Sequence, residues 1–123
     1  SRNQAIQWPL VELQTEAEML RWLIYRTAWE MDRMTGPEIQ LYLSDKVSMC
    51  NYRGNRLVCN AADWAMQVHG GMGYSRHKQF EHIYRHHRRY RITEGSEEIQ
   101  MRNVAGHMFG FIGKNRPREE ASK

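Results

Sequence analysis

Two apolar stripes with helical spacing constrain the fold of this chain more than any other feature of its sequence. Small and apolar side chains recur at intervals of three and four residues at Leu10, Leu13, Ala17, Leu20, Ile24, Thr27, Met31 and Met34. The same spacing recurs at Val47, Cys50, Gly54, Leu57, Ala61, Trp64 and Val68. Because an α-helix completes a turn about every 3.6 residues, each set lies along one helix face. The stripes therefore predict two long antiparallel helices, joined by a break at residues 35–38, where Gly36 and Pro37 interrupt the pattern.

Two further helices are predicted in the second half of the chain. Residues 70–75, GGMGYS, have three glycines in four positions, which predicts a loop whose Ser75 could cap the helix that follows. We expect that helix at about residues 78–91. After a break at residues 93–95, a fourth helix is predicted from Ser96, its N-cap, to Met108.

The fold class predicted from these four segments is an all-α, up-and-down four-helix bundle over residues 1–112. The chain has 123 residues, of which 41% are apolar, and this suits one domain with one core. Residues 113–123, GKNRPREEASK, are polar and contain a proline, so we predict a disordered tail there.

Composition narrows the function less than it narrows the fold. No apolar run approaches the roughly 20 residues that a membrane span needs, so no membrane span is expected. The net charge of +4 permits an anionic partner without choosing between nucleic acid, phosphate and other anions. Cys50 and Cys59 lie on one predicted helix, about 13 Å apart along its axis, which is too far for a disulfide. Reduced thiols suit a cytoplasmic protein, or one of the mitochondrial matrix in a eukaryote.

The acidic stretch ITEGSEEIQ, residues 92–100, contains the main candidate for chemistry. Glu97 and Glu98 suit the first turn of a helix, where the helix dipole favours negative charge. Glu94 can be explained in the same way, as one more acid near a helix start. It precedes the N-cap and adjoins Gly95, however, which leaves room for a ligand to reach the carboxylate. The alternative interpretation is therefore a catalytic base.

Two other motifs each have a structural and a functional interpretation. The glycines of HGGMG, residues 69–73, could let backbone N–H groups bind an anion, or could form a plain interhelical turn. They follow a helix rather than a strand, so they are not a Rossmann fingerprint. The basic run RHHRRYR, residues 85–91, could contact nucleic acid, bind a nucleotide phosphate or form a solvated helix face. His82 and His86 are four residues apart, but no ligand set is completed nearby and no metal site is expected.

These motifs together resemble the acyl-CoA dehydrogenase family. The stretch from Gln67 to Tyr74, QVHGGMGY, is similar to the family's glutamine–glycine–glycine segment. Arg85 follows eighteen residues after Gln67, where the family carries an Arg-Asp pair. Residues 92–100 resemble the family's Glu-Gly-Thr signature followed by Ile-Gln. Residues 25–29 and 47–49 also resemble its helices, so the similarity covers nearly the whole chain.

The resemblance implies the C-terminal helical domain of an FAD-dependent enzyme that oxidises an acyl-CoA to a 2,3-enoyl-CoA. It implies that Glu94 removes the α-proton of the substrate, and that the backbone of Glu94 and Gly95 contacts the thioester. The residues implied to contact FAD are Gln67, Gly70, Gly71, Ser96 and Glu98. Partners implied by the family are a second copy of the chain, in a homodimer or homotetramer, and electron-transfer flavoprotein or a similar electron acceptor. The isolated domain is expected to be inactive.

Three positions depart from the family pattern. Thr93 stands where an aromatic or large residue is common, Ser96 replaces a threonine, and His86 replaces the acid of the Arg-Asp pair. The substrate pocket and one structural ion pair could therefore differ. The alternative function is a basic helical module that binds nucleic acid, or one that serves only in assembly. Nucleic acid is not the expected partner.

Overall fold

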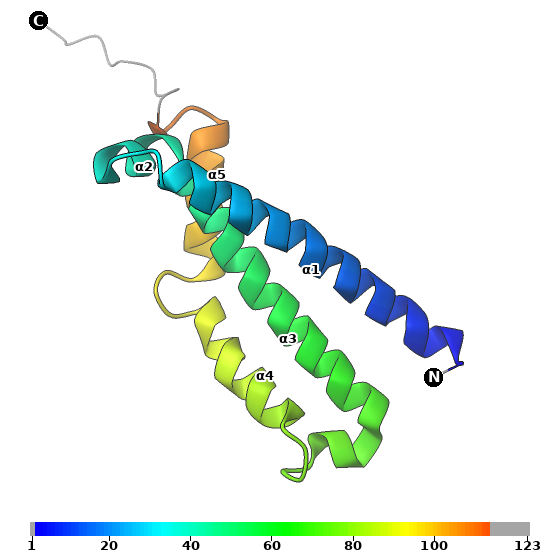
Figure 1. The fold of residues 1–123 in the computed structure, drawn as a ribbon. Coiled ribbons are helices and arrows are strands. Elements are labelled where there is room, and N and C mark those ends of the chain that lie inside the picture. The colour runs from blue at the N-terminus through cyan, green and yellow to red at the C-terminus, as the bar shows by residue number, and fades with distance from the viewer. Residues whose placement is uncertain (1, 114–123) are drawn as a thin grey trace, which may run out of the picture.

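The computed structural model describes residues 2–113, whose regular secondary structure is entirely helical (Figure 1). This confirms the all-α prediction. Five α-helices and one 3₁₀ helix follow in the order α1 (Gln4–Met31), α2 (Gly36–Tyr42), α3 (Ser44–Tyr74), α4 (Phe80–Arg88), η1 (Arg89–Arg91) and α5 (Glu97–Met108). The four helices predicted from the sequence correspond to α1, α3, α4 with η1, and α5.

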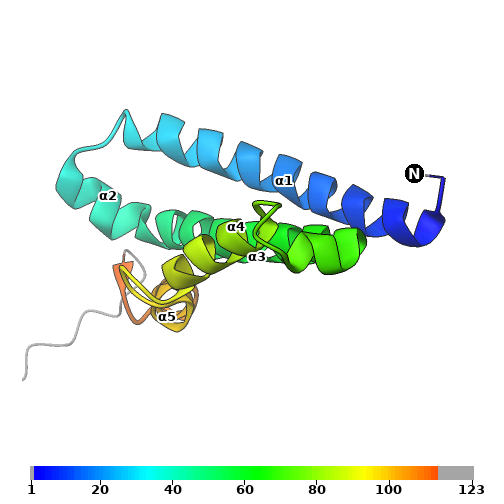
Figure 2. The same cartoon turned by 90° about the horizontal axis from the view of Figure 1, so that it is seen from below.

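The long helix α3 is the centre of the domain. α1 runs antiparallel to α3 along one side, and α4 and α5 pack on the other side (Figures 1 and 2). Thr27 is buried where the two apolar stripes meet: its hydroxyl donates to the carbonyl of Leu23 (2.7 Å) and accepts from the Cys50 thiol (3.7 Å). The side-chain spacing of α1 and α3 therefore produces the predicted antiparallel pair.

The break after α1 contains a short helix that the sequence pattern did not predict. Thr35 donates from its backbone N–H (2.8 Å) and from its hydroxyl (2.7 Å) to the Glu38 carboxylate. Pro37 lies at the start of this helix, where the absence of an N–H costs nothing. These contacts start α2, which reverses the chain direction before α3 begins.

The buried apolar core is small and is built around α3. Its members are Leu43, Cys59, Ala62 and Val104. The amide of Asn103 docks α5 onto the start of α3 by donating to the Ser44 carbonyl (3.0 Å) and the Ser48 hydroxyl (2.8 Å). Both contacts are side-chain hydrogen bonds to an adjacent helix, so they fix the position of α5 along α3.

The prediction of a loop at residues 70–75 was wrong. Gly70 alone leaves the helical conformation (φ 57°, ψ −146°), and the residues after it form a further helical turn up to Tyr74. A Cβ on Gly73 would lie 2.5 Å from the Met66 carbonyl oxygen, so the turn after the kink packs closely against the part of α3 that precedes it. Ser75 ends α3 instead of starting α4, whose N-cap is Gln79. The structure thus has a kink at Gly70, within α3, where the sequence predicted a loop.

The tail predicted to be disordered starts at residue 113, and residues 114–123 lie outside the described residues. Within residues 2–113, no helix is both long enough and apolar enough to cross a membrane.

Candidate functional site

The hinge between η1 and α5 holds Glu94 in an uncommon backbone conformation. Glu94 has φ 59° and is the one non-glycine residue with positive φ among residues 2–113; Gly95 follows with φ 87°. For an L-amino acid this left-handed conformation costs roughly 1–2 kcal/mol, so it persists only where surrounding contacts hold it. The Glu94 side chain is exposed. The hinge therefore projects its carboxylate away from the packed core.

One side chain of α5 reaches back to the hinge backbone. The Gln100 amide donates to the carbonyls of Glu94 (3.3 Å) and Gly95 (3.4 Å). Carbonyls in a tight bend have no helical partner, and the Gln100 amide satisfies both. The position of Gln100 six residues after Glu94 therefore supports the left-handed bend.

A buried ion cluster lies at the end of the same hinge. The Glu97 carboxylate accepts from Arg91 Nε (2.8 Å) and Nη2 (2.9 Å), and from Arg56 Nε and Nη2 (3.1 Å each). These hydrogen bonds, first from Arg91 and then from Arg56, lower the pKa of Glu97 from 4.5 to about 2. The sequence predicted only a helix-dipole role for Glu97. Arg56 lies 41 residues before Glu97, so no local pattern connects them; the opposite charges of Arg91 and Glu97 on either side of the hinge were the available signal.

The start of α5 brings four of the predicted site residues together. Glu94 and Gly95 form the bend, Ser96 is the N-cap position of α5, and Glu98 is exposed in its first turn. The Ser96 side chain makes no capping hydrogen bond to the backbone. Its hydrogen bond to Glu98 lowers the pKa of that carboxylate instead.

The other predicted cofactor residues lie elsewhere. Gln67, Gly70 and Gly71 are exposed at the kinked end of α3. This kink and the 92–96 hinge lie at opposite ends of α4, which runs antiparallel to α3 (Figures 1 and 2). A Cβ added to Gly70 or Gly71 would meet nothing within 4 Å, so the backbone there is open to an approaching group. The structure therefore divides the predicted site residues into two separate groups.

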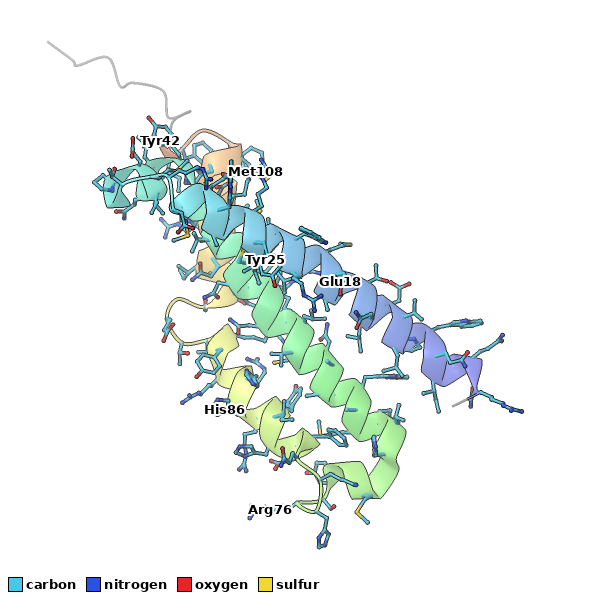
Figure 3. All side chains as sticks on the ribbon, in the orientation of Figure 1. Glu18, Tyr25, Tyr42, Arg76, His86 and Met108 are labelled. Atoms are coloured by element: carbon cyan, nitrogen blue, oxygen red, sulfur yellow. The ribbon has the colours of Figure 1, made fainter. Side chains whose placement is uncertain are left out.

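The basic run at residues 85–91 is divided between surface and interior. Arg85 pairs with Glu81 (3.1 Å), whereas Arg91 is half-buried against Glu97. His86 lies on the exposed side of α4 (Figure 3), where loss of hydration and then the nearby Arg89 lower its pKa. The ring centroids of His82 and His86 are 6.1 Å apart. Among residues 2–113, no three His, Cys, Asp or Glu side chains form a group that could hold a metal ion.

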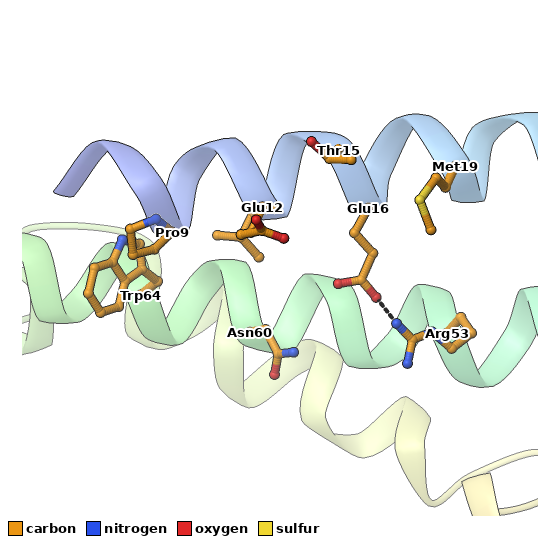
Figure 4. A pocket seen from close by; sticks show the side chains of 9 residues that line it. Pro9, Glu12, Thr15, Glu16, Met19, Arg53, Asn60 and Trp64 are labelled. Atoms are coloured by element: carbon orange, nitrogen blue, oxygen red, sulfur yellow. Dashed lines mark hydrogen bonds and ion pairs between the residues drawn. The ribbon is translucent and has the colours of Figure 1, made fainter. Parts of the chain in front are cut away.

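A groove of about 570 Å³ separates the first half of α1 from α3 (Figure 4). An ion pair between Glu16 and Arg53 crosses it. Trp64, a member of the predicted second stripe, lines the groove, and its buried indole N–H has no hydrogen-bond partner among the described residues. The groove lies between helices, and none of the residues predicted to carry chemistry lines it.

The sequence matches a known protein family over most of its length. The family model described as acyl-CoA dehydrogenase, C-terminal domain, matches residues 1–109. The chain belongs to the acyl-CoA dehydrogenase family.

Several curated proteins are similar to the chain over most of its length. It is 32% identical over 109 residues to a 3-(aryl)acrylate reductase of Clostridium sporogenes, covering 88% of this chain and 27% of that protein. It is 32% identical over 108 residues to the bovine short-chain specific acyl-CoA dehydrogenase of mitochondria, covering 88% and 25%. It is 27% identical over 103 residues to the CarC subunit of the caffeyl-CoA reductase-Etf complex of Acetobacterium woodii, covering 84% and 26%. The chain thus spans about a quarter of the length of these relatives.

Proposed function

We propose that this chain is the C-terminal domain of an FAD-dependent acyl-CoA dehydrogenase, in which Glu94 is the catalytic base. The observation that carries the proposal is the left-handed conformation of Glu94 at a hinge with an ordered backbone. Strained backbone at an exposed acid is typical of functional sites, because packing alone would favour a relaxed turn. The names of the relatives, which include a bovine acyl-CoA dehydrogenase, support the same reaction class.

The chemistry assigned to this chain is the removal of a proton. An α-proton of a thioester is too weakly acidic for a solvated carboxylate, so Glu94 must act in a site that excludes water. The α-proton passes to the Glu94 carboxylate, while backbone N–H groups at the bend stabilise the negative charge that develops on the thioester oxygen. FAD, when bound, supplies the acceptor for the hydride that leaves the β-carbon. The product is the 2,3-enoyl-CoA.

The residues proposed to contact FAD fit such a ligand in different ways. Gly70 and Gly71 present bare backbone beside the exposed Gln67, which suits close approach by a pyrophosphate. Ser96 and Glu98 provide polar groups beside the hinge. Because the two groups lie at opposite ends of α4 (Figure 1), we assign them to two different FAD molecules of a homo-oligomer.

The exposed aromatic face of α1 supports a role within a larger assembly. Trp8, Trp22 and Trp29 are each more than half exposed (64%, 68% and 57%). Their spacing in multiples of seven residues places them along one side of α1, and exposed apolar side chains gathered on one side of a helix mark a contact face. We propose that the rest of the polypeptide covers it, that acyl-CoA and an electron-transfer flavoprotein or a similar acceptor are the partners, and that the isolated chain is inactive.

The decisive test of the proposal is Glu94→Gln in the intact polypeptide that contains this domain, loaded with FAD. Glutamine has nearly the same shape as glutamate but cannot accept the α-proton. We expect anaerobic reduction of the flavin by an acyl-CoA to stop, with FAD content unchanged. Glu18→Gln, which removes a partly exposed carboxylate of α1 that pairs only with Arg21 of the same helix among the ion pairs of the described residues, is the matched control and should reduce flavin normally.

Normal flavin reduction by the Glu94→Gln variant would remove Glu94 from the mechanism. Turnover by residues 1–123 alone, mixed with FAD and a panel of acyl-CoA esters, would contradict the proposal that the domain needs the rest of the enzyme.

A further inference from the structure

We propose that Glu97 is a positioning residue for the base, and that its clamp with Arg91 and Arg56 holds the hinge in the conformation that presents Glu94. The inference rests on the proposed function of Glu94 and extends it to three residues to which no role in the reaction has been assigned.

The clamp closes the two ends of the hinge. Arg91 is the last residue of η1 and Glu97 the first of α5, so the paired hydrogen bonds between them (2.8 and 2.9 Å) span residues 92–96. A loop whose ends are joined has fewer accessible conformations than an open one. The conformations that remain accessible to the closed hinge include the left-handed bend at Glu94.

Arg56 connects this closed loop to the centre of the domain. It projects from α3 and makes its own pair of hydrogen bonds to the same carboxylate, at 3.1 Å each. Paired contacts between a guanidinium and a carboxylate fix orientation as well as distance. The amide of Asn55, the residue before Arg56, also donates to the Tyr90 carbonyl (3.1 Å). α3 thereby holds Tyr90 before the hinge and Glu97 after it.

Burial makes the cluster hard to rearrange. The Glu97 side chain is 10% exposed, and those of Arg91 and Arg56 are 24% and 32% exposed. Removing the carboxylate would leave two guanidinium groups facing each other with little water, so they would separate and release the hinge. The surface pair of Arg85 with Glu81, which lies within one helix, has no comparable connection to the hinge.

The expected effect is on the rate of the chemical step rather than on binding. A displacement of about 1 Å in a catalytic group can cost about 100-fold in rate. On the proposed function, the rest of the polypeptide contributes most of the contacts to the acyl-CoA, so its binding should change little. A loss of kcat with an unchanged KM is therefore the signature of a positioning role.

The test uses the intact FAD-loaded polypeptide with Glu97→Gln, Glu97→Asp and Arg91→Lys. We expect Glu97→Gln to lower the rate of flavin reduction by about 10-fold or more with KM unchanged within about twofold. Glu97→Asp, which keeps the charge, should recover part of the rate, and Arg91→Lys, which keeps the charge but loses the paired geometry, should be intermediate. Hydrogen exchange of the backbone at residues 92–96 should accelerate most in Glu97→Gln and less in Glu97→Asp and Arg91→Lys.

The matched control is Glu16→Gln, which breaks the other ion pair between a glutamate and an arginine of α3. It should change neither the rate nor the exchange at the hinge. Equal losses in the Glu16 and Glu97 variants would show general destabilisation and overturn the proposal, as would normal rate and exchange in Glu97→Gln. If Glu97→Gln does not fold, Arg91→Lys decides by the same two measurements.

Glu94→Gln separates the two proposals. If that variant is inactive and the Glu97 variants are normal, the positioning role alone fails. If the Glu94 variant stays active, the proposed function fails, and faster exchange in Glu97→Gln would then report a hinge clamp that positions no base.

Discussion

Titration of Glu97 should be visible as a pH-dependent loss of stability. Its pKa is lowered from 4.5 to about 2, mainly by hydrogen bonds from Arg91 and then from Arg56. A folded-state pKa below the unfolded value means that protons bind the unfolded chain more readily. The stabilisation is therefore fully present above about pH 5 and is lost as the pH falls toward about 2.

The size of the effect follows from the difference between the two pKa values. At 1.36 kcal/mol per pKa unit, the change from 4.5 to about 2 corresponds to about 3 kcal/mol. Both arginine side chains are partly solvated, with exposures of 24% and 32%, so screening reduces the expected contribution to about 2 kcal/mol.

The assay is equilibrium urea unfolding followed by circular dichroism, for the wild type and Glu97→Gln, between about pH 6 and about pH 2.5. Other carboxylates titrate in both proteins, so the difference between them isolates Glu97. We expect the wild type to be more stable by about 2 kcal/mol at about pH 6, with most of this advantage lost by about pH 2.5. Glu98→Gln, which removes an exposed acid of the same turn, is the control and should show a smaller difference. A wild-type advantage that is independent of pH would refute the assigned cause of the pKa shift.

Two further predictions concern packing and are checked by thermal unfolding. Gly73→Ala should destabilise the fold by about 1–3 kcal/mol, because the new Cβ would lie 2.5 Å from the Met66 carbonyl oxygen. The control is Gly71→Ala, whose new Cβ would meet nothing within 4 Å; it should be neutral or stabilising by up to about 1 kcal/mol. Equal effects of the two alanines would contradict the close packing of the turn after the kink. Leu43→Ala should cost about 2–5 kcal/mol because Leu43 is 2% exposed, whereas Leu41→Ala, 42% exposed, should stay within about 0.5 kcal/mol. A mild Leu43 variant would show that the core can close around the loss.

Local patterns predicted the helices well and their ends less well. The two stripes identified α1 and α3 because burial against one neighbour selects residues at helical spacing. The short helix α2 was missed, since seven residues are too few to show a periodic pattern. The sequence predicts a loop where the structure has a kink at Gly70, because a high glycine content indicates a weak helix but does not reveal whether the chain can resume a helical turn afterwards.

The sequence predicted only the part of the candidate site whose residues are close together in the chain. The hinge around Glu94 was expected from the Glu94–Gly95 pair and the helix start after it, and the structure places the bend there. That this acid is the catalytic base remains a prediction. The support given to the bend by Gln100 was not anticipated, although the residue lies within the same motif.

The sequence by itself determined the all-α class, the long helices and the position of the hinge, because helix periodicity and glycine breaks act over a few residues. The tertiary structure alone decided that Arg56 of α3 meets Glu97 of α5. The physical reason is that an ion pair between residues 41 positions apart depends on how whole helices pack, and packing registers are set by the sum of many contacts that no single motif records.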